Sequence, residues 1–143
     1  MSEGVTRPFA WDSRWTGKGA FTVTRDTAQS ASPPAALCIS STTGEVKGSV
    51  SQSLREVSGR KLRITAKIRN QGFTAAQVLV TAIDKGYKSC FNTVVITTPP
   101  TSGWQDFSAE VLVPTEAMRA NLALGVDGDG SAWFDDIAIE RLP

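Results

Sequence analysis

The chain has 143 residues, a length that fits one domain with a self-sufficient core. Its 15 basic and 14 acidic residues give a formal net charge of +1, which disfavours nucleic acid and anionic membranes as partners, because both select a basic surplus. Histidine is absent and cysteine occurs twice, so the commonest general base is missing and a zinc site built from cysteines alone is disfavoured.

The first 19 residues show no regular alternation and hold two of the four tryptophans, Trp11 and Trp15. We expect them to form an irregular N-terminal segment that packs on the rest of a single domain spanning residues 1–143. The opening MSEGVTRPFA lacks the apolar stretch of a signal peptide, and no apolar run approaches the length of a membrane span. If the parent protein is secreted, we expect this chain to be an excised or processed domain.

After this segment, nine short stretches alternate apolar and polar residues with a period of two, which is typical of half-buried strands in antiparallel sheets. In chain order they cover residues 19–26, 35–40, 48–54, 61–70, 75–84, 92–97, 104–114, 121–127 and 132–140. Clusters of Gly, Pro, Asn, Asp and Ser separate them, including NQG at 70–72 and DGDG at 127–130, which we interpret as turns. Such strands without helices between them predict an all-β fold, an antiparallel β-sandwich or jelly roll.

Three stretches stand out by their order and spacing. They are GSVSQSLREVSGRKLRITAKIRN, TSGWQDFSAEVLVP and GSAWFDDIAIE. Together they resemble the galactose-binding-like β-sandwich of many carbohydrate-binding modules, especially those appended to xylanases and glucanases. The resemblance implies a non-catalytic module that tethers a larger, extracellular polysaccharide-active protein to a polysaccharide or oligosaccharide. The alternative is a structural or protein-interaction β-sandwich of a larger extracellular enzyme, with no sugar site.

Aromatic side chains are the first candidates for a glycan site, because their faces stack on the C–H face of a sugar ring while polar side chains satisfy its hydroxyl groups. On this ground Trp11, Tyr87 and Phe91 are the aromatic candidates, since they lie in or beside expected loops. We expect the remaining tryptophans to be packing residues: Trp15, Trp104 and Trp133.

A row of cations on the polar face of the stretch 61–70 is the second candidate. Its members, spaced about 6–7 Å apart where they alternate, are Lys61, Arg63, Lys67 and Arg69. Because Arg pairs well with carboxylates, this basic stripe suits an acidic polysaccharide, and Arg63, Lys67 and Arg69 are the expected contacts. The alternative is a solvated sheet face whose cations pair with Asp106 and Glu110 of a neighbouring strand.

Small residues mark a third surface, in the stretch 121–127. Ala123 and Gly125 alternate there with Leu122, Leu124 and Val126. If the larger residues face the core, the small ones leave room for the floor of a groove.

Two adjacent carboxylates, Asp135 and Asp136, open the last expected strand. Strict alternation places Asp135 on the face of Ile137 and Ile139, together with Trp133, and we expect this face to be the core. A carboxylate in such a place must be paired, hydrogen-bonded or bound to a metal. Since adjacent strand residues point to opposite faces, the two carboxylates cannot flank one glycosidic bond, and a hydrolase is disfavoured.

The resemblance implies a metal for Asp135, because modules of this fold often hold one structural Ca²⁺ with the corresponding Asp and backbone carbonyls. Candidates for a second carboxylate are Asp26, Asp12 and Glu3. Many relatives supply a glutamate from an Asn-Gly-X-Phe-Glu segment, where this chain has TRPFAWDSRW. The alternative is that Asp135 accepts backbone N–H bonds.

The stretch DGDGSAWFD is a weaker calcium candidate. Asp127, Asp129 and Ser131 take the first, third and fifth positions of a calcium loop, but Ala132 and Ala138 stand where that loop needs Gly and Glu. We therefore prefer a tight glycine-rich hairpin turn here. Cys38 and Cys90 are expected to be free thiols, with a disulfide as the alternative.

Overall fold

Nine β-strands and no helix make up the part of the chain that the structure, a computed structural model, describes: residues 2–5, 13–28, 36–101 and 103–143. In chain order they are β1 (Ser2–Val5), β2 (Ser13–Lys18), β3 (Phe21–Asp26), β4 (Ala36–Ser41), β5 (Val46–Leu54), β6 (Lys61–Ile83), β7 (Ser89–Thr98), β8 (Gln105–Leu112) and β9 (Arg119–Leu142). All their pairings are antiparallel, which confirms the predicted all-β fold class. Within the described residues, no helix could span a membrane.

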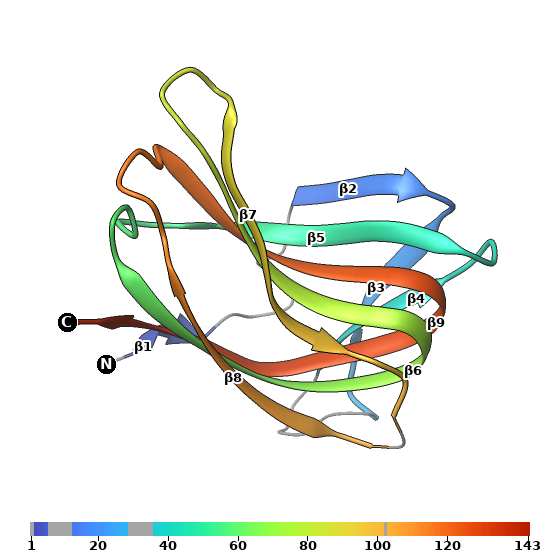
Figure 1. Cartoon of the computed structure of the whole chain (residues 1–143). Helices are drawn as coiled ribbons and strands as arrows, with labels where there is room; N and C mark the ends of the chain where they lie inside the picture. The colour runs from blue at the N-terminus through green and yellow to red at the C-terminus, as the bar shows by residue number, and fades with distance from the viewer. Residues whose placement is uncertain (1, 6–12, 29–35, 102) are drawn as a thin grey trace.

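Two long central strands, β6 and β9, build both layers of the sandwich (Figure 1). They pair with each other along nearly their whole length and turn back together in the middle. The second half of β6 and the first half of β9 form one layer, in the order β7–β6–β9–β5–β2, which we call the front layer. The remaining halves form the back layer, β8–β6–β9–β4–β3, with β1 added at the end of β9.

Two glycine-rich stretches that we predicted as turns lie instead at the bend of the two long strands. NQG and DGDG, including the expected hairpin, do not end strands, because both lie inside the continuous β6 and β9. Gly72 and Gly128 have φ values of 109° and 117°, a region that other residues rarely adopt. A Cβ on Gly130 would lie 2.4 Å from the Gln71 carbonyl oxygen, so the two bent strands touch backbone to backbone. Glycine here lets a strand change layers instead of ending it.

The hydrophobic core lies between the two layers. In the first half of β6, Leu62, Ile64 and Ile68 are fully buried while Lys61 and Arg63 are exposed, as the period-two alternation predicts. Other buried core residues come from the front layer and from the end of β9: Val78, Val80, Leu122, Leu124, Ile137 and Ile139. Both cysteines are free thiols, and burial raises the pKa of the Cys38 thiol.

The expectation of an irregular segment over residues 1–19 is wrong for the described part of that range. Ser2–Val5 pairs with the end of β9, and Ser13–Lys18 pairs with β5 as an edge strand of the front layer. Neither stretch alternates clearly in sequence. Their partner strands supply the hydrogen bonds that hold them, and such long-range pairing leaves no local signal.

Candidate functional site

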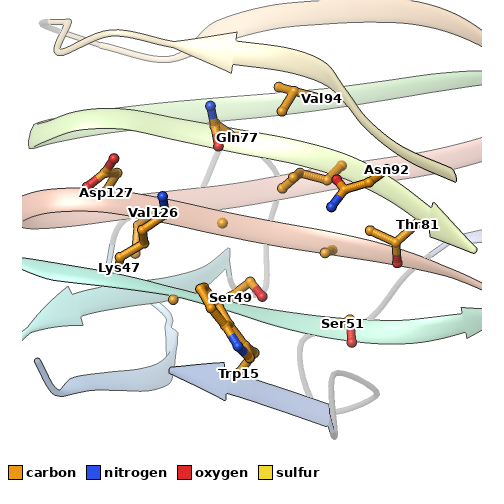
Figure 2. Close-up of a pocket in the computed structure, with 14 residues that line it drawn as sticks. Trp15, Lys47, Ser49, Ser51, Gln77, Thr81, Asn92, Val94, Val126 and Asp127 are labelled. Carbon is orange, nitrogen blue, oxygen red and sulfur yellow. The ribbon is translucent and has the colours of Figure 1, made fainter. Parts of the chain in front are cut away.

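An open groove of about 580 Å³ lies on the outer face of the front layer (Figure 2). Its floor comes from β5, β9 and β6. The edge strands form its two sides, with Trp15 of β2 on one and Asn92 and Val94 of β7 on the other. All five strands of the layer therefore contribute to one surface.

Strand register orders the lining residues into rows that cross the groove, because directly opposed residues of an antiparallel pair project from the same face. In the first row, Trp15 lies opposite Ser49, Ser49 opposite Gly125, and Gly125 opposite Gln77. In the second row, Ser51, Ala123, Leu79 and Val94 follow one another. Thr81 and Asn92 form part of a third. Successive rows are about 6.6 Å apart along the strands.

The floor is low because its central residues are small. Ala123 and Gly125 line the groove, while Leu122 and Leu124, which alternate with them, are fully buried; this confirms the predicted groove floor. A Cβ on Gly125 would lie 3.1 Å from Cδ1 of Leu79. A larger residue at 125 would therefore fill the groove or displace the Leu79 side chain.

Among the described residues that line the groove, Trp15 is the one aromatic residue. Its side chain is 54% exposed, so the expectation that it packs in the core is wrong. The reason is topological: β2 is an edge strand, and Trp15 shares the outer face of the front layer with Ser49. An exposed indole beside hydroxyl and amide groups is what a sugar ring can stack on.

Five uncharged polar side chains line the groove beside small and apolar residues: Ser49, Ser51, Gln77, Thr81 and Asn92. In the part of the chain that the structure describes, the charged members of the lining are Lys47 and Asp127, which lie directly opposite each other on β5 and β9 at one end of the groove. The groove is therefore close to neutral and rich in hydrogen-bonding groups. In the sequence, the one signal for these residues is the run of small polar residues in SVSQSL, which alternate with larger ones as Ala123 and Gly125 do in the stretch 121–127.

The basic stripe lies elsewhere, on the outer face of the back layer, and is ion-paired. Arg63 contacts Glu110 at 3.0 Å and Glu140 at 3.3 Å, and Lys61 contacts Glu110 at 3.2 Å. Hydrogen bonds from Arg63 and Lys61 hold the pKa of the Glu110 carboxyl below its usual value. The cross-strand pairing that we gave as the alternative is thus present.

Toward the bend, the other two stripe residues also have contacts. Lys67 lies 3.7 Å from Asp136, and the guanidinium of Arg69 lies 5.3 Å from the ring centroid of Trp133. Asp106, the other expected partner, is opposite Lys67 in the register of β8. None of the four cations lines the groove.

Of the three predicted aromatic candidates, the structure describes Tyr87 and Phe91, and neither lines the groove. Tyr87 is 74% exposed in the turn between β6 and β7, as its expected loop position requires. Phe91 packs against the core, because it lies opposite Ala82 on the inner face while its neighbour Asn92 faces the groove. Trp11 lies outside the described residues.

A bulge at the paired carboxylates changes the predicted facing of the last strand. Asp136 has a φ of 49°, and the register with β6 shifts between Asp135 and Ala138. The extra residue reverses the alternation, so Phe134 and Ile137 both face the core. The prediction that Asp135 points inward is therefore wrong. Asp135 is half-buried opposite Lys67, and its Oδ1 accepts the N–H of Asp136 at 2.8 Å.

Trp133 is buried, as predicted, but in a small cluster outside the main core. It packs there with Ala36 and Cys38, and the half-buried Trp104 packs against the same cluster. Its indole N–H donates to Oδ2 of Asp26 at 2.9 Å. Asp26 Oδ1 accepts the N–H of Ala28 at 2.9 Å.

These contacts bear on the predicted calcium site. Among the described residues, no three Asp, Glu, Cys or His side chains come together as a metal site would need. Asp12 lies outside the described residues, as does the side chain of Glu3. Since a calcium ion takes six to eight oxygen ligands, a site on Asp26 and Asp135 would draw most of its ligands from backbone carbonyls and water. Structural calcium remains a prediction of the sequence.

Solved structures with this fold include several carbohydrate-binding modules. The chain is 14% identical to the CBM22-1–GH10 modules of Clostridium thermocellum endo-1,4-β-D-xylanase 10B, solved with xylohexaose, with a TM-score of 0.78 over 100% of this chain and 29% of that one. It is 13% identical to the CBM22-1 xylan-binding domain of Paenibacillus barcinonensis Xyn10C, with a TM-score of 0.69 over 90% and 85%.

A similar fold also occurs in the enzymatically active domain of bacteriophage CBA120 tailspike protein 4, at 14% identity and a TM-score of 0.74, over 94% of this chain and 20% of that one. The chain thus spans less than a third of two of the structures it matches. No protein-family model and no curated protein sequence matches it. At these identities the likeness shows the fold alone, a β-sandwich that these carbohydrate-binding modules also have.

Proposed function

We propose that this chain is a non-catalytic carbohydrate-binding module and that the groove of its front layer holds a neutral polysaccharide. The observation that carries the proposal is the lining itself: one exposed indole beside a row of hydroxyl and amide groups over a low floor. The indole offers a stacking face for a pyranose ring, and the polar groups offer partners for its hydroxyls. An open groove also accepts a long chain from the side.

The charges of the groove and of the basic stripe favour an uncharged ligand. Within the groove, Lys47 and Asp127 oppose each other, so a polyanion gains no net attraction there. The basic stripe that suggested an acidic glycan lies on the other layer and already has carboxylate partners. A neutral chain is therefore the better fit.

The carboxyl groups of the described lining support a binding role. Glycoside hydrolysis generally needs two carboxyl groups that flank the scissile bond. Among the described residues, the groove lining supplies one, Asp127, and its direct neighbour across the sheet is Lys47.

A module of a larger secreted protein is the context that we propose for this single domain. Support comes from the solved structures, in which a fold of this size covers 20% and 29% of longer chains. Tethering would then raise the effective concentration of the parent protein on its polysaccharide.

Affinity electrophoresis against neutral and uronic-acid polysaccharides, followed by calorimetry, tests the function. We expect neutral glycans to bind, and Trp15→Ala to weaken binding about tenfold, or about 1.4 kcal/mol. Gly125→Val should fill the floor and also weaken binding. The affinity should hold from about 0.05 M to about 0.5 M salt, because no charge pairing is involved.

Arg63→Ala separates this proposal from the acidic-glycan prediction. The groove proposal expects unchanged binding, whereas the basic stripe requires a loss. If no glycan binds, the proposal is wrong, and the result favours the alternative of a structural or protein-interaction β-sandwich with no sugar site. A melting curve with a chelator, run beside these assays, tests the calcium prediction: a lower midpoint would support a bound ion.

A further inference from the structure

Gly17 lies two residues after Trp15 on the edge strand β2, at an irregularity in the pairing. Thr16 is opposite Gly48 and Lys18 is opposite Lys47, so Gly17 is an extra residue that faces no partner on β5. Bulges of this kind commonly re-aim a neighbouring side chain.

The indole of Trp15 lies directly over Gly17. A Cβ built on Gly17 would be 2.5 Å from Cη2 and 2.9 Å from Cζ2 of that ring, closer than such atoms approach in real structures. The φ of Gly17 is not positive, in contrast to Gly19 at 68°. The φ at 17 therefore does not require glycine, whereas the three atoms nearest to a Cβ there all belong to the Trp15 ring.

We propose that Gly17 is a positioning residue: its missing side chain holds the Trp15 indole flat along β2, with its free face toward the groove. This inference rests on the proposed function, since it assigns the cause of the stacking geometry at that same site. A side chain at 17 would lift the ring away from the wall of the groove.

The fold should tolerate such a change. Gly17 and Trp15 are both exposed on an edge strand, and the clashing atoms are the far end of a side chain that can rotate. Gly19 offers the contrast, because a Cβ there would meet the backbone oxygen of Glu45 at 2.4 Å. Gly17→Ala should therefore affect the ring, and Gly19→Ala the fold.

The test makes two measurements on the full chain that carries Gly17→Ala. Gly103→Ala is the matched control, since a Cβ at 103 meets nothing within 4 Å. The first is the NMR spectrum of the four indole N–H groups without ligand, in which loss of a signal in Trp15→Phe assigns Trp15. The second is affinity for the neutral glycan that the wild type binds, measured also in Trp15→Ala and in the double variant.

We expect Gly17→Ala to shift the Trp15 signal alone, to keep the melting midpoint, and to weaken binding about tenfold. Added to Trp15→Ala it should have no further effect, because both changes remove the same contact. An unmoved Trp15 signal, or a moved signal with unchanged affinity, overturns the inference. A wild type that binds no glycan sinks the proposed function instead, and the shifted signal would still support the ring's dependence on Gly17.

Discussion

Asn70 is the polar residue that ties the bend of β6 to its surroundings. It is fully buried, its Nδ2 donates to the carbonyls of Phe73 and Thr98 at 2.9 Å each, and its Oδ1 accepts the N–H of Phe73 at 3.1 Å. The side chain thus replaces ladder hydrogen bonds that the bend interrupts, and buried backbone groups need such replacements.

Replacing Asn70 with alanine should therefore lower the free energy of unfolding by about 2–4 kcal/mol, since three buried backbone groups lose their partner. Urea denaturation measures the change. Asn92→Ala, at an exposed position of β7, is the control and should stay within about 0.5 kcal/mol of the wild type. Equal effects of the two substitutions would contradict the role given to Asn70.

Single residues also set the limit of what alternation predicts. The pattern of the stretch 61–70 assigns its faces correctly, whereas the same logic fails at Asp136, where one extra residue reverses the facing of everything that follows. Asp tolerates positive φ, and that is the one local hint of a bulge. The spacing of apolar residues does not show whether a bulge forms at such an Asp.

At the scale of elements, glycine clusters have two meanings that sequence cannot separate. NQG and DGDG carry strong turn signals, yet both sit inside long strands. Each cluster bends because the other one lies against it: Gly72 approaches Asp129 and Gly130, and Gly130 approaches Gln71 and Phe73. That fit joins residues almost sixty positions apart, so it becomes visible only in the folded molecule.

Gly130→Ala should consequently lower the unfolding free energy by more than about 2 kcal/mol. The added Cβ would meet backbone atoms, 2.4 Å from the Gln71 oxygen and 2.7 Å from the Phe73 nitrogen, and backbone cannot rotate away as a side chain can. Chemical denaturation of this variant and of Gly103→Ala compares the two. A stable Gly130→Ala protein would show that the strands can separate at the bend.

On the scale of the whole molecule, the two outer faces have different chemistry. The front face carries small and neutral polar residues around one indole, and the back face carries a network of ion pairs. One part of each face was predictable from the sequence: Ala123 with Gly125 on the front face, and the basic stripe on the back face. The sequence pattern is local. It could not place them on opposite sides, because β6 and β9 change layers between those pieces.

The ion pairs of the back face predict a pH dependence. The folded-state pKa of Glu110 is held below its ordinary 4.5, so its contribution to stability is present above that pH and is lost as the pH falls through the lower folded value. Glu110→Gln should lower the melting midpoint at pH 7, and the deficit should shrink toward pH 3. Glu116→Gln controls for net charge, and a deficit that is constant with pH would contradict the assignment.

The shared strands have one more consequence. Where a sandwich is made of two separate sheets, each can slide over the other and change its curvature. Here, β6 and β9 run without a break through both layers, so the curvature of the front layer is coupled to the packing of the core between the layers. If the groove binds a glycan as we propose, its shape is present before binding, and binding costs little conformational entropy of the protein.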